Sequence, residues 1–526
     1  MQPKILVSDP IAQEGIDVLA RRAQVDVKLG LKPPELCDIV GEYDGMVVRS
    51  ETKVTAEVIR AGRRLRVVGR AGVGVDNIDI AAATERGIVV VNAPTGNITS
   101  AAEHTIGLML ALARHIPQAH QSLMEGRWQR ARFIGLEVRG KTLGIVGLGQ
   151  VGSEVARRAK GLEMRVLACD PYVPEERAHA LGVELVSLED LLRESDFVAL
   201  NTALTPQTRM IIGAKEIALM KPAARLINTA RGELVDEEAL ARALEEGRLA
   251  GAALDVFSQE PPGESPLLKS DKVIVTPHLG ASTAEAQERV AMDVAEQIMD
   301  VLEGRPARYA VNAPLIPPET FSALAPYLAV AQKTSSLASQ LSDGRPGEVE
   351  IHYAGTIALH DVTPLTAAII RGLLEPVTEE FVNIVNFRLV AQHRGLRISE
   401  HKGPSHEIYN NLITVRLAAS GGATTVSGTL AHDGPHVVFI NDFWVDIPPG
   451  EGYLLVCENR DRPGMIGAVG IMLGGFDVNI SFMNVGRTTK RGHALMVLML
   501  DESLTPEQLQ EVRAIPDFYS ARLARL

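Results

Sequence analysis

The chain has 526 residues, the length of three or four ordinary domains. Its 53 basic and 65 acidic residues give a net charge of −12, which argues against a general nucleic-acid binder. Three widely spaced cysteines exclude a disulfide scaffold and a zinc ribbon, and no apolar run is long enough to span a bilayer. With no signal-peptide pattern at the N-terminus, we expect a cytoplasmic, multidomain protein that does not enter the membrane.

The first 300 residues alternate short apolar runs with helical patterns. Several runs are continuously apolar, which is typical of parallel strands covered by helices on both faces. The expected strands are residues 4–9, 45–49, 66–71, 87–92, 142–148, 165–170, 196–201, 224–230, 251–257 and 272–278. Ser100 and Glu103 have capping-box spacing and predict that a helix opens at Ser100. The pattern predicts an α/β fold with two doubly wound parallel sheets.

The second half of the chain has a different pattern of expected helices and strands. Residues 304–320 are rich in proline and predict a linker after a long helix over 283–302. A helix over 321–341 and β-rich runs to about residue 450 predict an α+β unit. After a turn at 447–452, the order strand, helix, strand, strand, helix, strand predicts a ferredoxin-like fold.

A glycine-rich turn, GLGQVG at 147–152, follows an apolar strand and opens a helix. Glycines in this context let a backbone approach a pyrophosphate at a helix N-terminus. Asp170 ends the next strand and would accept hydrogen bonds from the adenosine ribose, which favours NAD over NADP. The expected cofactor contacts in the turn are Gly147, Gly149, Gln150, Val151 and Gly152.

Three further segments follow expected strands and carry Arg231, Asp255, Glu260 and His278. Residues beyond the carboxyl ends of parallel strands gather at one edge of the sheet, so these side chains are expected to converge. Oxidation of a secondary alcohol needs a base, and the imidazole of His278 can cycle near neutrality. Glu260 would orient that ring, and Arg231 would hold the substrate carboxylate in a fork.

Together with GRAGVGVDNID (69–79) and NAPTGNITSAAEH (92–104), these segments resemble the D-2-hydroxyacid dehydrogenase family. The resemblance implies that Arg231, Glu260 and His278 are catalytic. It also implies cofactor contacts from Thr202, Thr229, Ala230, Asp255 and Gly280. The two extra C-terminal units resemble the long-form branch of this family, whose members oxidise 3-phospho-D-glycerate with NAD.

The resemblance also implies a domain division and a substrate face. Residues 1–97 and 284–310 would form the substrate-binding domain and 98–283 the NAD-binding domain, followed by an intervening domain at 316–450 and a regulatory ACT domain at 452–526. The substrate face would comprise Arg49, Arg70, Gly72, Val73, Gly74 and Asn97. Trp128 would anchor a dimer or tetramer, and Arg130 would add charge to the neighbouring subunit's site.

The last unit, which resembles the ACT fold, would bind an amino acid such as serine between two copies of the domain. The resemblance implies effector contacts from Asn459, Asp461 and Asn479. Relatives often carry a ring side chain where Asn459 stands, so serine sensitivity stays open. The resemblance implies extra anion sites in the intervening domain, to which His401, Lys402 and His406 could belong, but we interpret these three as surface residues. No metal site is expected.

The resemblance therefore implies an enzyme that oxidises 3-phospho-D-glycerate to 3-phosphohydroxypyruvate with NAD, opening serine biosynthesis under serine feedback, with reduction of 2-oxoglutarate as a side activity. The alternatives are another 2-hydroxyacid dehydrogenase, such as a hydroxypyruvate or glyoxylate reductase, and a non-catalytic NAD-sensing binding protein. An amino-acid-binding regulator without catalysis would not need Arg231, Glu260 and His278 together. No nucleic acid or membrane is expected as a partner.

Overall fold

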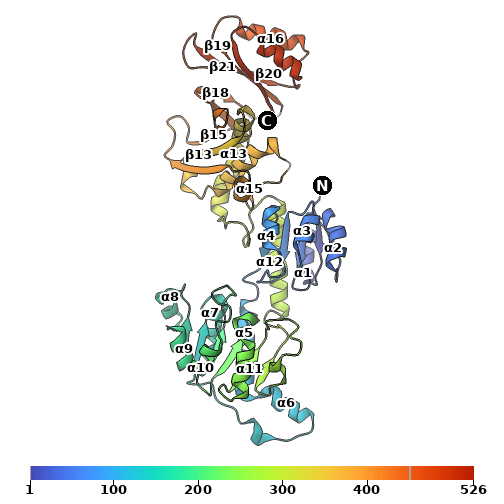
Figure 1. Cartoon of the computed structure of the whole chain (residues 1–526), viewed down its shortest axis with the longest axis vertical. Coiled ribbons are helices and arrows are strands. Elements are labelled where there is room, and N and C mark those ends of the chain that lie inside the picture. The colour runs from blue at the N-terminus through green and yellow to red at the C-terminus, as the bar shows by residue number, and fades with distance from the viewer. Residues whose placement is uncertain (1, 379, 449, 451, 526) are drawn as a thin grey trace.

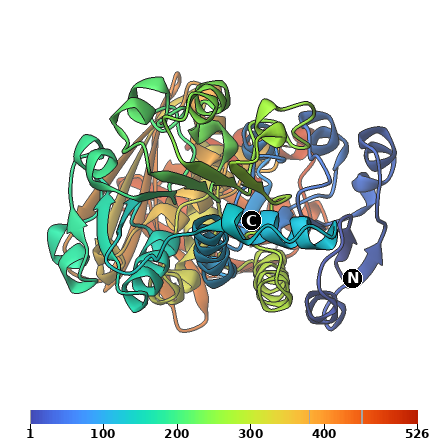
Figure 2. The same cartoon turned by 90° about the horizontal axis from the view of Figure 1, so that it is seen from below.

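The computed structural model describes residues 2–378, 380–448, 450 and 452–525. The molecule is elongated, and its four sheets belong to four units, which we number in chain order (Figure 1). The second unit, in green, lies at one end, the first unit, in blue, lies beside it, and the third and fourth units occupy the other end. The view along the long axis shows the second unit in front of the third, with the first unit to one side (Figure 2).

The first unit is a parallel five-stranded sheet in the order β2-β1-β3-β4-β5. Helices α1 and α12 cover one face and α2, α3 and α4 the other, which explains the continuously apolar strands. The bounds are β1 Lys4–Val7, α1 Gln13–Ala20, β2 Gln24–Val27, α2 Pro33–Ile39, β3 Gly45–Val48, α3 Ala56–Ala61, β4 Val67–Arg70, α4 Ile80–Glu85, β5 Val89–Asn92 and α12 Ala284–Leu302.

Helix α12 returns the chain from the second unit to the first sheet. Its N-cap is Thr283, whose side chain accepts a hydrogen bond from the Ala286 N–H at 3.2 Å. Val294 and Ile298 of this helix are fully buried against the sheet. Burial of each such side chain is worth roughly 1.5–3 kcal/mol, so this helix is a main support of the first unit.

The second unit is a parallel seven-stranded sheet in the order β12-β11-β10-β9-β6-β7-β8. The strand order reverses between β6 and β9, and a ligand crevice is expected at such a reversal. The bounds are α5 Ile98–Arg114, α6 Ile116–Met124, β6 Thr142–Val146, α7 Gln150–Gly161, β7 Arg165–Cys169, α8 Glu175–Ala180, β8 Glu184–Leu185, α9 Leu188–Glu194, β9 Phe197–Leu200, α10 Ala214–Leu219, β10 Arg225–Asn228, α11 Glu237–Glu245, β11 Gly251–Leu254 and β12 Val273–Val275.

The third unit is a mixed sheet in the order β14-β13-β15-β16-β17-β18, with helices α13 and α14 packed on one face. Burial alternates along β13, so the opposite face of that strand stays open. The bounds are α13 Pro318–Leu341, β13 Pro346–Gly355, α14 Thr363–Leu374, α15 Phe387–His393, β14 Arg397–Gly403, β15 Asn411–Ala419, β16 Gly422–Ala431, β17 Gly434–Ile440 and β18 Phe443–Ile447.

The fourth unit confirms the expected ferredoxin-like order and forms an antiparallel sheet β20-β21-β19-β22. Its last strand lies against the third unit, where Arg522 forms an ion pair with Asp343. The bounds are β19 Tyr453–Arg460, α16 Met465–Gly475, β20 Ile480–Arg487, β21 His493–Leu500, α17 Pro506–Arg513 and β22 Phe518–Arg525. The expected turn at 447–452 includes residues 449 and 451, which lie outside the described residues.

Short 3₁₀ helices occur at Val40–Glu42, Arg130–Phe133, Gly232–Leu234, Pro266–Lys269, Thr356–Leu359 and Glu375–Val377. Within the described part of the chain, no helix has both the length and the apolar composition needed to cross a membrane. Two short strands, β2 and β8, were not predicted because each has at most four residues, half of them polar.

The expected helix start at Ser100 is wrong. Helix α5 begins at Ile98 with Asn97 at its N-cap, so Ser100 lies inside the first turn. The Ser100 hydroxyl donates to the Asn97 carbonyl at 2.9 Å instead of capping an N–H. The upstream segment is fixed by Arg289, whose side chain donates to the Gly96 carbonyl at 3.1 Å.

The expected linker over 304–320 is only partly correct. Ala310 forms an antiparallel bridge with Val91 of β5. Asn312 donates to the Ile88 carbonyl at 2.9 Å and accepts from the Val90 N–H at 2.8 Å. The first part of the segment is therefore held on the edge of the first sheet. Helix α13 then starts three residues earlier than expected, because a proline fits its first position.

Candidate active site

The glycine-rich turn lies at the reversal point of the second sheet, directly after β6. Gly147 has φ +94°, and a Cβ there would lie 2.7 Å from the Asn201 carbonyl oxygen, so the turn requires glycine. A Cβ on Gly149, by contrast, would meet no protein atom within 4 Å. Gly149 is the N-cap of α7, and Gln150, Val151 and Gly152 form the first turn. The open side of Gly149 is thus available to a phosphate group.

Asp170 follows β7 and faces this turn. Its carboxylate accepts from the Leu148 N–H and from the Tyr172 N–H, each at 2.9 Å. These two bonds hold the side chain next to the glycine-rich turn. The position fits an acidic group that receives the ribose hydroxyls of a dinucleotide.

Asp255 is fully buried after β11 and organises the neighbouring segment. It accepts from the Thr276 hydroxyl at 2.6 Å and from the Leu279 and Gly280 N–H groups at 2.7 and 2.8 Å. His104 Nε2 lies 3.1 Å from the same carboxylate. Burial raises the pKa of Asp255, but the bonds from His104, Thr276 and Leu279 outweigh it and hold the pKa below its ordinary value.

The other expected cofactor contacts line the ends of β9 and β10. The Thr229 hydroxyl is held by the Thr105 hydroxyl at 2.7 Å. The Ala230 N–H donates to the Asn228 side chain at 3.1 Å. Thr202 is half-buried after β9. These positions lie at the carboxyl edge of the sheet, where a ligand of this fold binds.

His278 and Glu260 form a close pair. His278 Nδ1 lies 2.8 Å from Glu260 Oε2, and both side chains remain partly exposed. The other Glu260 oxygen accepts from the Phe257 N–H at 3.2 Å. Because Nδ1 is engaged by the carboxylate, Nε2 is the ring nitrogen left for a substrate proton.

Three arginines gather around a loop of the first unit. Arg231 comes from the second unit and forms a 3.8 Å ion pair with Asp76. Arg70 Nε donates to the Arg49 carbonyl at 3.2 Å, and a Cβ on Gly74 would lie 3.1 Å from Arg70 Nη1. Burial, with the nearby positive charge of Arg231, lowers the pKa of Arg70. The concentrated positive charge and the small loop residues suit a bound anion.

The remaining substrate-face residues adjoin this loop. Val73 is 38% exposed, and its carbonyl accepts from the Asn92 side chain at 2.5 Å. A Cβ on Gly72 would lie 3.6 Å from Arg70 Nη1. Asn97 is half-buried at the N-cap of α5, where its side chain caps no N–H. The side-chain amide of Asn97 is therefore not used to cap helix α5.

Two positioning groups escaped the sequence analysis. Asp9 is 1% exposed after β1 and accepts from the Arg49 N–H at 2.6 Å and the Thr52 N–H at 3.1 Å. His104 lies on α5 and contacts Asp255, as described above. The signals were present: Asp9 is a lone acid directly after an apolar strand, and His104 ends one of the family-like segments.

The expected effector residues do not meet within one chain. Asn459 pairs with Ala494 at one end of β21, whereas the residue after Asn479 pairs with Leu500 at the other end. Asp461 lies beside Asn459, beyond the end of β19. The two parts of the expected site therefore lie at opposite ends of the fourth sheet.

Each of these three side chains has its own surroundings. The Asp461 carboxylate accepts from the Arg491 N–H at 2.9 Å and from Arg487 at 3.2 Å, which lowers its pKa. The Asn479 amide donates to Asp501 at 2.6 Å. Asn459 is 2% exposed, and its Oδ1 has no hydrogen-bond partner among the described residues.

Trp128 projects from the second unit and is 81% exposed. It borders a surface hollow of about 450 Å³ that also includes Leu123, Arg130 and Phe133. Helix α6, which precedes this segment, forms a protruding arm at the end of the molecule (Figure 1). This exposed position fits the expected contact with a second subunit.

The three residues noted in the third unit have different partners. Lys402 donates to the His360 carbonyl at 2.6 Å, and His406 stacks on Tyr409 with ring centroids 5.7 Å apart. His401 instead stacks on His352 at 4.7 Å. The structure gives no common site for this set.

The chain matches three family models. The NAD-binding domain of D-isomer specific 2-hydroxyacid dehydrogenases matches residues 106–280, the intervening domain of D-3-phosphoglycerate dehydrogenase matches 323–441, and the ACT domain matches 453–517. D-3-phosphoglycerate dehydrogenase of Synechocystis is 48% identical, covering 99% of this chain and 95% of the relative. The chain belongs to the D-3-phosphoglycerate dehydrogenase family. Its Methanocaldococcus jannaschii relative is 44% identical, covering 99% of this chain and 100% of the relative.

Solved structures match 59% of the chain. The TT0316 protein of Thermus thermophilus is 37% identical with a TM-score of 0.55, covering 59% of this chain and 99% of that chain. D-lactate dehydrogenase of Aquifex aeolicus, complexed with NAD and lactic acid, is 28% identical with a TM-score of 0.53, covering 59% and 99%. The chain is thus an oxidoreductase whose cofactor is NAD, and the open side of Gly149 beside Asp170 fits that cofactor.

Proposed function

We propose that the chain oxidises 3-phospho-D-glycerate to 3-phosphohydroxypyruvate, the opening step of serine biosynthesis. The observation that carries this proposal is the cluster of Arg49, Arg70 and Arg231 around the glycine-rich loop of the first unit. A substrate with both a carboxylate and a phosphate needs more positive charge than the single arginine that holds a carboxylate. Relatives over the whole chain are named for this substrate.

The proposed chemistry divides the work among named groups. Bound NAD supplies the acceptor for the hydride that leaves C2 of the substrate. His278 Nε2 takes the proton of the C2 hydroxyl, so the C–O bond becomes a carbonyl, and Glu260 on Nδ1 favours the imidazolium that results. Arg231 holds the carboxylate and stabilises the developing charge on oxygen. Arg49 and Arg70, with the backbone at Gly72, Val73 and Gly74 and the Asn97 amide, bind the phosphate end.

Steady-state kinetics of the full-length protein test this substrate assignment. We expect kcat/KM with NAD to be highest for 3-phospho-D-glycerate among 3-phospho-D-glycerate, D-glycerate and D-lactate. The arginine cluster gives the reason, because only the first compound carries a second anion. Equal or higher kcat/KM for D-glycerate would favour the reductase alternative within the same family.

We also propose that serine binds the ACT unit across two copies of the chain, with Asn459 and Asp461 from one copy and Asn479 from the other. Two observations support this arrangement: the residues are separated within one chain, and the Asn459 Oδ1 has no hydrogen-bond partner in the described part of the chain. A homo-oligomer, anchored also by Trp128, follows from the same proposal. A cytoplasmic location fits with it, since Cys37, Cys169 and Cys457 are not in disulfides.

Calorimetry with L-serine tests the effector proposal. We expect saturable serine binding and inhibition by the intact enzyme, both lost in Asn479→Ala, while NAD-dependent turnover without serine stays unchanged. An effector must bind one state of the enzyme better than another, so binding and inhibition should disappear together. Absence of both in the wild type at millimolar serine would contradict the proposal.

A further inference from the structure

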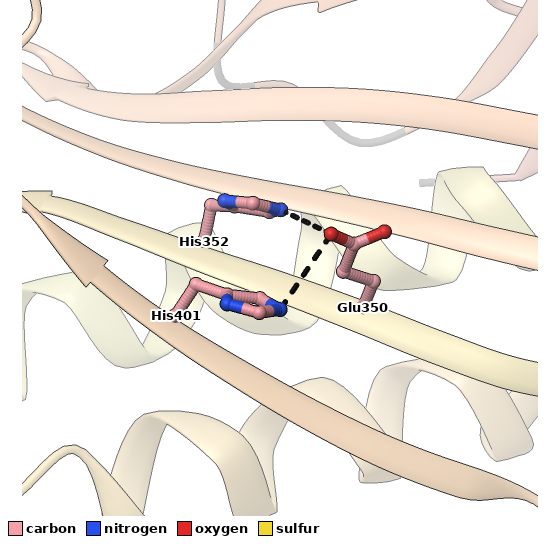
Figure 3. A group of neighbouring side chains, drawn as sticks. All are labelled: Glu350, His352 and His401. Carbon is pink, nitrogen blue, oxygen red and sulfur yellow. Dashed lines mark hydrogen bonds and ion pairs between the residues drawn. The ribbon is translucent and has the colours of Figure 1, made fainter.

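Two strands of the third sheet bring together two histidines and a glutamate. Strands β13 and β14 run parallel, and His352 of β13 pairs directly with His401 of β14. Glu350 lies two residues before His352, so the alternation of a strand puts both on the same face. This is the face opposite the buried Val349 and Ile351. Figure 3 shows all three side chains on this face, with both rings directed toward the carboxylate.

The donor atoms have the spacing of metal ligands. His352 Nε2 lies 2.8 Å and His401 Nε2 lies 3.6 Å from the same oxygen, Glu350 Oε1. One ligand atom from each residue lies within 4.8 Å of the other two. Metal–ligand bonds of about 2.0–2.2 Å in a tetrahedral zinc site put neighbouring ligands about 3.3 Å apart. The observed distances lie on either side of that value.

The donor atoms favour a cation over an anion at this point. Glu350 is the only carboxylate of the group, and each ring directs one nitrogen toward it (Figure 3). Its second oxygen, Oε2, accepts from Arg416 at 3.3 Å, which leaves Oε1 to the histidines. A phosphate or carboxylate ligand would have to displace Glu350 from both rings. A divalent ion would instead accept the Nε2 lone pairs of two neutral rings, each with its proton on Nδ1, and would use the same three atoms.

We propose that Glu350, His352 and His401 bind one Zn²⁺ ion. Two neutral imidazoles and one carboxylate are a ligand set that zinc commonly takes, with a fourth position for water. Strand β14 is the edge strand and is hydrogen-bonded only to β13 among the strands of the sheet. The ion would join these two strands and so stabilise the edge of the third unit. This site is independent of the dehydrogenase cleft.

The same sheet offers a matched control. His436 of β17 also lies between carboxylates, with Nδ1 2.7 Å from Asp446 and Nε2 2.9 Å from Asp433. Both of its ring nitrogens are occupied by different acids, so the ring does not share one oxygen with a second histidine as His352 does. We expect no zinc site there.

The test is a titration of chelator-stripped, full-length protein with Zn²⁺ alone against a chromophoric chelator. The wild type and His436→Gln should each bind one tight equivalent per chain, and His352→Gln and His401→Gln should each lose it. Co²⁺ should give visible absorption bands of a bound ion in the first pair only. Binding should weaken as the pH falls, because the imidazoles must lose their protons to bind the metal.

Thermal unfolding supplies a second readout. Zn²⁺ should raise the Tm of the wild type and of His436→Gln, because a ligand that binds the folded chain stabilises it, and should leave the two site variants unchanged. Retained NAD-dependent turnover shows that the variants are folded. The proposal is overturned if the wild type binds no more zinc than His352→Gln, or if His436→Gln loses the tight equivalent.

Discussion

The strand ends of the second sheet and the ends of the fourth sheet were both predicted as ligand sites, but their predicted residues are arranged differently. At the strand ends of the second sheet, His278 meets Glu260 at 2.8 Å, and Asp170 reaches the glycine-rich turn at 2.9 Å. In the fourth unit, Asn459 and Asn479 lie at opposite ends of β21. The first set of residues meets within a single chain, whereas Asn459 and Asn479 do not.

Sheet geometry explains the difference. All strands of the second sheet are parallel, so every segment that follows a strand emerges at the same edge. In the fourth sheet, β19 and β20 each run antiparallel to β21 and therefore share one direction. The end of β19 and the start of β20 must then lie at opposite edges. The convergence of the strand-end residues was therefore predictable from the sequence only for the second sheet, because all of its strands are parallel.

The largest effect is expected at the proposed base. His278→Ala should lower kcat by about 10²–10⁴, because the hydroxyl proton loses its acceptor, while the Kd for NAD changes little. The check is steady-state turnover with parallel NADH-binding fluorescence. Normal turnover in this variant would contradict the claim that Arg231, Glu260 and His278 of one chain are the catalytic residues.

The phosphate end should show the next largest effect. Arg49→Ala should raise KM for 3-phospho-D-glycerate by about 10–100-fold, the equivalent of losing one hydrogen bond to a charged group. KM for unphosphorylated 2-oxo acids should change far less. The exposed Arg63 is the control, and Arg63→Ala should alter neither value. A similar rise for both kinds of substrate would place Arg49 at the shared carboxylate.

A stability test sharpens the account of the buried carboxylate. Asp255→Asn leaves N–H donors facing an amide and should cost about 1–3 kcal/mol of unfolding free energy. The pKa of Asp255 is lowered in the folded chain. Its carboxylate therefore contributes to the free energy of unfolding when the pH is above the ordinary pKa of 3.8, and this contribution is lost as the pH falls through the pKa of the folded chain. Urea midpoints from pH 6 to pH 3 should therefore show the gap between wild type and variant closing below pH 3.8.

The exposed acid Asp271 of the same unit provides the matched control for that experiment. Asp271→Asn should leave the urea midpoint nearly unchanged at each pH. A constant gap between wild type and Asp255→Asn over the whole pH range would show that the lost bonds, and not the charge of Asp255, set the difference.

The smallest effect concerns the choice of cofactor. Wild type should prefer NAD to NADP. Asp170→Ala should lower the ratio of kcat/KM with NAD to kcat/KM with NADP by about tenfold, the equivalent of about 1.4 kcal/mol. The variant keeps the arginine cluster, so KM for the substrate should stay close to that of the wild type. Equal kcat/KM for the two cofactors in the wild type would contradict the role of Asp170.

Much of the fold was predictable because apolar strands, glycine turns and strand-end residues leave local signals. The ten expected strands of the first two units all form, and the helix expected over 283–302 is α12, which begins one residue later. Contacts between distant segments were not predictable. The bonds that hold Asn312 on the first sheet and the pairing of His352 with His401 depend on register, which no local pattern encodes.

Deuterium transfer tests the central claim most directly. The full-length wild type is given NAD and 3-phospho-D-glycerate labelled with deuterium at C2. If hydride passes directly from this carbon at the site of Arg231, Glu260 and His278, the NADH formed carries the label. The L isomer of the substrate should yield no NADH. NADH without deuterium, or equal turnover of the L isomer, would contradict the account.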